Sequence, residues 1–158
     1  MKGQHEYRAE VRWQRGATET FTDQRYSRGH RWQFDGGVEV PASSSPSVVP
    51  LPYSVAAAVD PEEAFVASLS SCHMLFFLSY AAQQGYVVEA YLDQATGTMG
   101  PNEHGQVVMI KIVLHPQIRW AGERVPDAQQ IAALHERAHH DCFLANSVRC
   151  PVIVAPAA

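Results

Sequence analysis

The chain is poor in lysine, in cysteine and in net positive charge. Of its 158 residues, 12 are Lys or Arg and 16 are Asp or Glu, so the formal charge is −4 and the isoelectric point is near 6.0. A nucleic-acid-binding protein needs a basic face, so this balance argues against nucleic acid as the main partner. Three cysteines, at positions 72, 142 and 150, do not suggest structural disulfides in an intracellular chain. They favour thiols that are free, metal-bound or redox-active.

An apolar stretch behind a charged start is also missing. The first residues read Met-Lys-Gly-Gln-His-Glu-Tyr, without the features of a secretory signal, so we expect a cytoplasmic protein. No internal repeat and no interdomain linker is visible. With 46% apolar residues and a length that suits one core, the chain is expected to form a single α+β domain over residues 1–158.

Apolar periodicity predicts strands toward both ends of the chain. The expected strands are 5–14, 17–23, 29–35, 87–99, 107–114 and 148–154. In the first of them one side is apolar and the other charged, which is typical of a half-buried strand. Pro151 confines the last strand to a sheet edge. Residues 41–56 are rich in Pro and Ser and predict an extended loop.

A first helix is predicted to begin after Asp60. Asp60 is a favourable N-cap, Pro61 suits the first helical position, and Glu63 completes a capping box. The helix should run to about Gln84, with Gly85 as its stop. Residues 64–82 carry no charge and are long enough to cross a bilayer. Because serines, a His and a Cys interrupt them, we expect a helix buried on all sides and no membrane association.

A second helix is predicted from Pro126 and Asp127 to about Phe143. It contains His135-Glu136-Arg-Ala-His139, which matches the H-E-x-x-H pattern of zinc hydrolases, with Cys142 on the same face. Few residues follow in which a further zinc ligand could lie. The alternative is a polar helix whose histidines occupy exposed positions. A zinc-dependent hydrolase therefore stays open as a competing function.

Two cysteine segments carry a resemblance to a known family. Residues 61–72, PEEAFVASLSSC, are similar to the central-helix motif of the OsmC/Ohr family of organic hydroperoxide reductases. In that motif the peroxidatic Cys follows the Glu by ten residues. Residues 135–148, HERAHHDCFLANSV, resemble the family's second cysteine segment, and YSRGH at 26–30 with PASS at 41–44 resembles one of its branches. The similarity extends in order and spacing over nearly the whole chain.

The resemblance implies a fold and roles for particular residues. The implied fold has antiparallel sheets packed around a long buried central helix, in an intertwined homodimer. Cys72 matches the peroxidatic Cys, Cys142 the resolving Cys and Glu62 the active-site carboxylate. The implied function is thiol-dependent reduction of organic hydroperoxides, without a cofactor or metal. The family's usual electron donor is a lipoylated protein or dihydrolipoamide.

The resemblance also implies an active-site arginine in the N-terminal strands. Arg28 is the best match, and Arg25 and Arg31 are alternatives. The chemistry asks for such a cation, because a nearby guanidinium lowers the pKa of a thiol and so supplies the attacking thiolate. A carboxylate could hold the guanidinium through a bidentate pair. Attack on the peroxide gives a sulfenic acid, a second thiol converts it to a disulfide, and exchange with a thiol reductant restores the pair.

The spacing of Glu62 and Cys72 predicts a dimer. Ten residues of helix separate two side chains by roughly 15 Å along the axis and about 280° around it. One helix cannot bring both groups to one site, so we expect Glu62 and Arg28 of one chain to serve Cys72 and Cys142 of another. A non-catalytic dimeric binding protein of the same fold is the second alternative function. Cys150 is expected to be a core residue.

Overall fold

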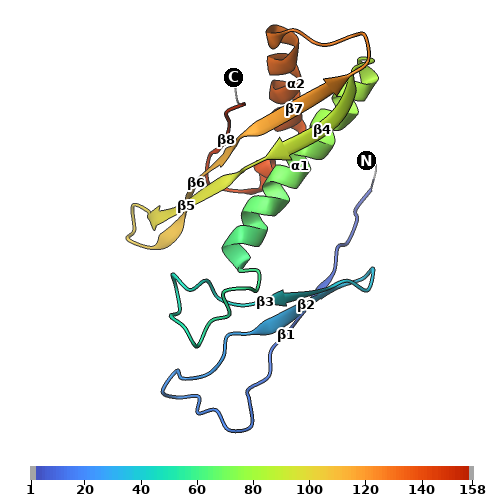
Figure 1. Cartoon of the computed structure of the whole chain (residues 1–158). Coiled ribbons are helices and arrows are strands. Elements are labelled where there is room, and N and C mark those ends of the chain that lie inside the picture. The colour runs from blue at the N-terminus through green and yellow to red at the C-terminus, as the bar shows by residue number, and fades with distance from the viewer. Residues whose placement is uncertain (1–2, 157–158) are drawn as a thin grey trace. The chain divides into compact units, whose positions relative to one another are not determined.

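The computed structural model describes residues 3–156, which form two compact units (Figure 1). The first unit extends through Ala64 and the second begins at Phe65, so the boundary falls in the first turn of a long helix. Each unit has its own secondary structure and is described separately below. The assignment of one domain to the whole chain stays a prediction.

The first unit is a three-stranded antiparallel sheet with long connections. Its strands are β1 (Ala9–Arg12), β2 (His30–Phe34) and β3 (Glu39–Ala42), in the order β1-β2-β3 (Figure 1). The strand expected at 17–23 is instead a series of turns and bends, and β3 was not expected. Every residue of β1 is exposed, including Val11 at 66%. The expected half-burial of this strand is therefore wrong for a single chain.

Helix α1 (Pro61–Gln83) has the ends that the sequence predicts. The Asp60 side chain accepts a hydrogen bond from the Glu63 N–H at 2.8 Å, and the Glu63 side chain accepts one from the Asp60 N–H at 3.3 Å, which completes the capping box. At the other end Gly85 has φ +77°, a conformation that favours glycine, and the next N–H reaches back to the Ala81 carbonyl at 3.0 Å.

One side of α1 is buried, and the rest is not. The buried residues are Leu69, His73, Phe77, Tyr80 and Ala81. Leu75, by contrast, is 60% exposed. The expectation of a helix buried on all sides therefore fails within one chain. By length and composition α1 could also cross a bilayer, with a mean hydropathy of 1.4 over its most apolar window, of which 28% is buried.

The second unit places strand pairs against two helices. Its strands are β4 (Val87–Asp93), β5 (Thr96–Pro101), β6 (Val107–Leu114), β7 (Pro116–Ala121) and β8 (Val152–Val154). β4 pairs with β7, and the other three form a sheet in the order β5-β6-β8. All of these pairs are antiparallel except β6-β8, and β8 is at the edge, as Pro151 predicts. The predicted α+β class with antiparallel sheets is confirmed.

Helix α2 (Ala128–Asp141) packs beside α1 under the β4-β7 pair (Figure 1). Asp127 caps its first turn through a capping box with Gln130. Cys142 is its C-cap, and a short 3-10 helix, η1 (Ala145–Ser147), follows. The core between these elements contains Phe77, Ala81, Leu134 and Ala138, all fully buried. This packing fixes where α1 and α2 approach each other.

Candidate active site

The thiols of Cys72 and Cys142 meet inside the second unit. Cys72 is half-buried in the middle of α1, and Cys142, 1% exposed, ends α2. The two side chains are close enough for Cys72 to affect the pKa of Cys142, although 70 positions separate them in the sequence. The Ala145 N–H also donates to the Cys142 sulfur at 3.4 Å. The structure thus brings together the two cysteines that the sequence singled out.

The two thiols are not equivalent. Burial, and next the neighbouring Cys72 thiol, raise the pKa of Cys142 to about 11. At neutral pH Cys142 is therefore a thiol, and it is poorly suited to attack a peroxide itself. The more accessible Cys72 is the better candidate for the nucleophile.

Contacts between α1 and α2 flank the thiol pair. Phe76 of α1 meets Phe143 edge-on at 4.9 Å between ring centroids. The Tyr80 hydroxyl donates to the Asp141 carboxylate at 2.5 Å, and this bond lowers the pKa of Asp141. Both partners on the α2 side are direct sequence neighbours of Cys142.

A pair of buried histidines lies on the same two helices. His73 is 1% exposed and His135 4%, and Nε2 of His73 is 3.0 Å from Nδ1 of His135. Their rings are nearly parallel, at 7°, and the His135 ring also stacks on Phe77. Burial lowers the pKa of both imidazoles to about 4, assisted for His73 by His135 and His139. Both rings are therefore neutral at physiological pH.

This pair corrects the expectation that the α2 histidines are exposed. His135 is buried and His139 half-buried. The ring nitrogen of His135 that faces α1 is already bonded to His73, and Glu136 is exposed on the helix surface. Among residues 3–156 no group of three or more His, Cys, Asp or Glu side chains is arranged to hold a metal ion. The described structure thus gives the zinc-hydrolase alternative no support.

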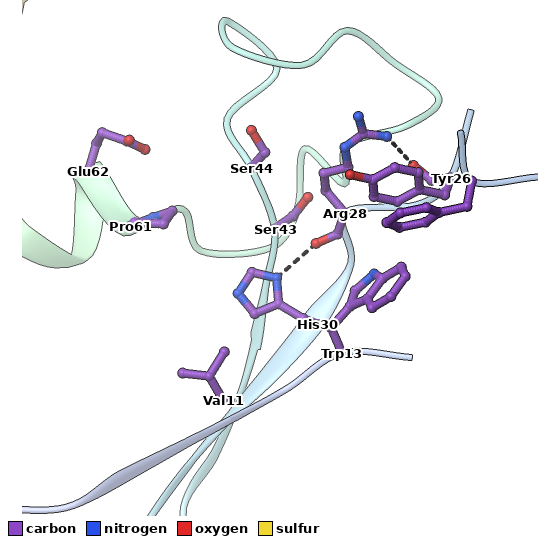
Figure 2. A pocket seen from close by; sticks show the side chains of 10 residues that line it. Val11, Trp13, Tyr26, Arg28, His30, Ser43, Ser44, Pro61 and Glu62 are labelled. Atoms are coloured by element: carbon purple, nitrogen blue, oxygen red, sulfur yellow. Dashed lines mark hydrogen bonds between the residues drawn. The ribbon is translucent and has the colours of Figure 1, made fainter. Parts of the chain in front are cut away.

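The first unit contains a cavity with a positive and a negative side chain at its walls. Its volume is about 440 Å³, and it is lined by Val11, Trp13, Phe21, Tyr26, Arg28, His30, Ser43, Ser44, Pro61 and Glu62. Figure 2 shows Glu62 and Arg28 on opposite sides of it, with the serines between them. Two of the predicted site residues, Arg28 and Glu62, are thereby brought to one cavity, whose apolar wall is aromatic.

Arg28 is held by an aromatic ring and by backbone carbonyls. Its guanidinium carbon lies 3.7 Å from the centre of the Tyr26 ring, and Nη1 donates to the Tyr26 carbonyl at 2.5 Å (Figure 2). Nη1 also donates to the Gln24 carbonyl at 2.7 Å. The expected bidentate pair with Glu62 is not present in the part of the chain that the structure describes. For the same residues, Nε and Nη2 of Arg28 have no acceptor, so one edge of the guanidinium is open to a partner.

The two alternative arginines lie elsewhere. Arg25 and Arg31 are exposed, and Arg31 lies 3.6 Å from the carboxylate of Glu39. Neither lines the cavity. Cys150, the third thiol, packs against the core cluster of Leu69, Ile112 and Leu114, as expected for a core residue.

Sequence reasoning missed two features of these sites. The rings of Trp13, Phe21 and Tyr26 form a cluster, with Phe21 and Tyr26 stacked at 4.6 Å. They come from three separate positions in a long connection, so no local pattern marks them. The His73–His135 pair was also missed. Its only signal is a His directly after Cys72 in an otherwise uncharged helix.

Comparison with known proteins identifies the family of this chain. A family model described as OsmC-like protein matches residues 54–156. A solved structure of an OsmC-like protein of unknown function from Vibrio cholerae is 52% identical over 98% of this chain and 100% of that one, with a TM-score of 0.96. No curated protein matches the chain.

More distant solved structures share the fold. An organic hydroperoxide resistance protein OsmC from Legionella pneumophila is 16% identical over 99% of this chain and 100% of its own, with a TM-score of 0.71. An organic hydroperoxide resistance protein from Elizabethkingia anophelis is 20% identical over 99% and 96%, with a TM-score of 0.68. The match of the family model to most of the chain, together with the 52% identical relative, shows that this protein belongs to the OsmC-like family.

Proposed function

We propose that this protein is a thiol peroxidase that reduces organic hydroperoxides to alcohols. The observation that carries the proposal is the proximity of a half-buried Cys72 to a buried Cys142 whose raised pKa keeps it protonated. Membership of the OsmC-like family supports it, as do fold relatives that are named organic hydroperoxide resistance proteins.

In the first step the Cys72 thiolate attacks the terminal oxygen of the hydroperoxide. The sulfur–oxygen bond forms as the oxygen–oxygen bond breaks, the alkoxide takes up a proton, and the products are an alcohol and a Cys72 sulfenic acid. Sulfur is oxidised by two electrons and the peroxide is reduced by two. A cation beside the thiolate favours this step, because it stabilises the reactive form of the thiol.

In the second step Cys142 resolves the sulfenic acid. Its sulfur bonds to the Cys72 sulfur, the hydroxide leaves, and the Cys142 proton converts that hydroxide to water. The raised pKa of Cys142 suits this role, since its proton is retained until the leaving group needs it. The product is a Cys72–Cys142 disulfide, which protects Cys72 from further oxidation.

A dithiol reductant then completes the cycle. Two successive thiol–disulfide exchanges transfer two electrons and two protons to the cysteine pair, and the reductant becomes a disulfide. A dihydrolipoamide group, free or attached to a protein, has the required pair of thiols. This cycle requires a reducing compartment, which agrees with the proposed location in the cytoplasm.

The complete site is proposed to form in a homodimer. α1 is one continuous helix, so the ten residues between Glu62 and Cys72 separate them by roughly 15 Å along its axis. Apolar side chains that a partner could cover are exposed on both units, among them Val11 and Leu75. In this arrangement Arg28 of one chain stabilises the thiolate of the other, and Glu62 orients the guanidinium and the bound peroxide.

A thiol count after a single turnover tests the proposal. Reduced protein is mixed with one equivalent of cumene hydroperoxide, tert-butyl hydroperoxide or hydrogen peroxide, and free thiols and the alcohol product are measured. The expected result is one alcohol formed and two thiols lost per chain, faster with the organic peroxides. Turnover is then compared with dihydrolipoamide and with a thioredoxin system as electron donor. Unchanged hydroperoxide consumption in Cys72→Ser would instead favour a non-catalytic binding protein.

A further inference from the structure

The buried histidine pair is more than hydrophobic packing requires. Each imidazole has a second ring nitrogen, and both of these, Nδ1 of His73 and Nε2 of His135, are buried without a partner among the described residues. Leaving a buried polar atom unsatisfied destabilises the fold, whereas two apolar side chains of similar shape would leave no such atom. The pair therefore carries a cost that an apolar contact at this place would avoid.

What the pair offers is a fixed register between two helices. Apolar surfaces can slide over each other, but an N–H···N bond has one preferred distance and direction. A single polar contact in an apolar interface can thereby select one alignment of two helices. Here the 3.0 Å bond and the 7° angle between the rings define how α2 is rotated and placed along α1.

Each histidine of the pair lies on the same helix as one of the two cysteines, so the helix alignment that the pair sets also affects the position of the thiols. His73 is the residue after Cys72, and His135 precedes Cys142 by seven residues, about two turns of α2. The Phe76–Phe143 and Tyr80–Asp141 contacts hold the same two helices near Cys142. The other two contacts involve the residues directly next to Cys142 in sequence. The histidine bond is buried and polar, and it holds α2 about two turns before Cys142.

We propose that His73 and His135 are positioning residues for disulfide formation: their hydrogen bond aligns α2 on α1 so that the Cys142 sulfur lies against the Cys72 sulfur. The inference rests on the proposed function and concerns its second step. A disulfide requires the two sulfurs to approach to about 2.05 Å with a narrow range of dihedral angles. A misplacement of about 1 Å can slow such a reaction by roughly 10²-fold.

Amide substitutions can separate the position of the bond from the size and polarity of the side chain. An Asn side chain places its polar atoms where Nδ1 of a histidine lies, and a Gln side chain reaches the place of Nε2. At position 135 the bonded atom is Nδ1, so His135→Asn should preserve the link and His135→Gln should lose it. At position 73 the bonded atom is Nε2, so the order is reversed: His73→Gln should preserve the link and His73→Asn should lose it.

The primary readout is the Cys72–Cys142 disulfide equilibrium, which needs no peroxide. Each variant is equilibrated in dithiothreitol buffers, and the oxidised fraction is measured by thiol trapping and intact mass. We expect His135→Asn and His73→Gln to stay within about threefold of the parent, and His135→Gln and His73→Asn to favour the dithiol by at least tenfold, which corresponds to about 30 mV. His104→Asn, at an exposed histidine in the β5-β6 turn, is the matched control and should not change the equilibrium.

The second readout follows the peroxide reaction. With one equivalent of cumene hydroperoxide and dimedone as a sulfenic acid trap, the two disruptive variants should form the Cys72 adduct at the parent rate but little disulfide. The expected order of the Asn and Gln variants is opposite at positions 73 and 135, and we call this the crossed pattern. If the parent consumes no hydroperoxide but the crossed pattern appears in the dithiothreitol equilibrium, the proposed function fails and the positioning role stands.

The crossed pattern keeps the proposal testable even if one variant does not fold, as judged by circular dichroism. Positions 73 and 135 make the same prediction independently, so one folded Asn and Gln pair at either position is sufficient. Equal disulfide equilibria for Asn and Gln at both positions, or the opposite order, would overturn the proposal.

Discussion

The two units of the chain differ in how much of the proposed reaction each could carry out without the other. The second brings half-buried Cys72 beside buried Cys142 and keeps Cys142 protonated within one chain. The first holds Arg28 and Glu62 around an open cavity and leaves its β1 strand exposed. The thiol chemistry can thus be derived from one unit, whereas the charged groups of the other have no reacting partner inside it. The predictions below test whether the two units serve one reaction.

The largest expected effect belongs to the nucleophile in the second unit. Cys72→Ser should reduce hydroperoxide turnover by on the order of 10³-fold or more, because the hydroxyl that replaces the thiol is not ionised at neutral pH. Steady-state consumption of cumene hydroperoxide measures this. Cys150→Ser is the matched control and should retain parent turnover, since Cys150 packs against a core cluster and takes no part in the proposed reaction. Comparable loss in both variants would contradict the assignment.

The second effect is the acid sensitivity of the second unit. The pKa of His73 and His135 falls from 6.5 in the unfolded chain to about 4 in the folded one. Above pH 6.5 neither state is protonated; between pH 6.5 and 4 only the unfolded state binds these protons. The free energy of unfolding should therefore decrease as the pH falls through this range, by on the order of a few kcal/mol for the pair together.

Urea denaturation between pH 7.5 and 4 measures this slope. The double variant His73→Gln/His135→Asn keeps the link between the helices without a titrating group, so its slope should be distinctly smaller. An equal slope in parent and double variant would show that the buried pair is not its source.

A smaller effect is expected from the cation of the first unit. Arg28→Met should lower kcat/KM for hydroperoxide by about 10²-fold, the usual cost of removing one preorganised stabilising group. Stopped-flow measurement of Cys72 sulfenic acid formation tests the step directly. Arg31→Met is the control, because Arg31 is exposed beside Glu39 and does not line the cavity. Sulfenic acid formation at the parent rate in Arg28→Met would show that the reaction of Cys72 does not depend on the cation of the first unit.

The smallest effect concerns the helix that carries Cys142. Asp127 caps α2 through a capping box with Gln130. Asp127→Ala should lower the free energy of unfolding by about 1 kcal/mol, because the Gln130 N–H in the first turn loses its acceptor. Peroxide turnover should be unchanged, since the thiols lie at the opposite end of the helix. Urea denaturation and turnover assays together check this, and a large loss of turnover would place the start of α2 in the site.

Local signals explain which parts of the fold could be predicted. Both helices begin where a capping Asp and its partner three residues later place them, and α1 ends just before Gly85. The strand expected over 87–99 is instead two strands. Asp93 ends the first of them by accepting hydrogen bonds from Ser70 and from the His115 N–H. These partners lie more than twenty positions away, and no Gly or Pro marks the break.

The site was predictable only where a motif lies within one segment. The resemblance of the segments around Cys72 and Cys142 led to both thiols. Arg28 was the best match for the cation, with Arg25 and Arg31 as alternatives nearby, and only the cavity separates it from them. His135 was misjudged as an exposed residue because its partner, His73, is 62 positions away. A buried polar pair formed across two helices leaves no periodic signal in either of them.

The most direct test of the joint action of the two units is a mixed dimer. Cys72→Ser chains and Arg28→Met chains are purified separately, are each expected to be impaired, and are then combined through two different affinity tags. If Arg28 serves the partner's Cys72, each mixed dimer contains one intact site and should recover about half of the parent turnover. If Arg28 and Cys72 of the same chain act together, both sites of the mixed dimer are defective. Turnover no higher than that of the two variants alone would contradict the account.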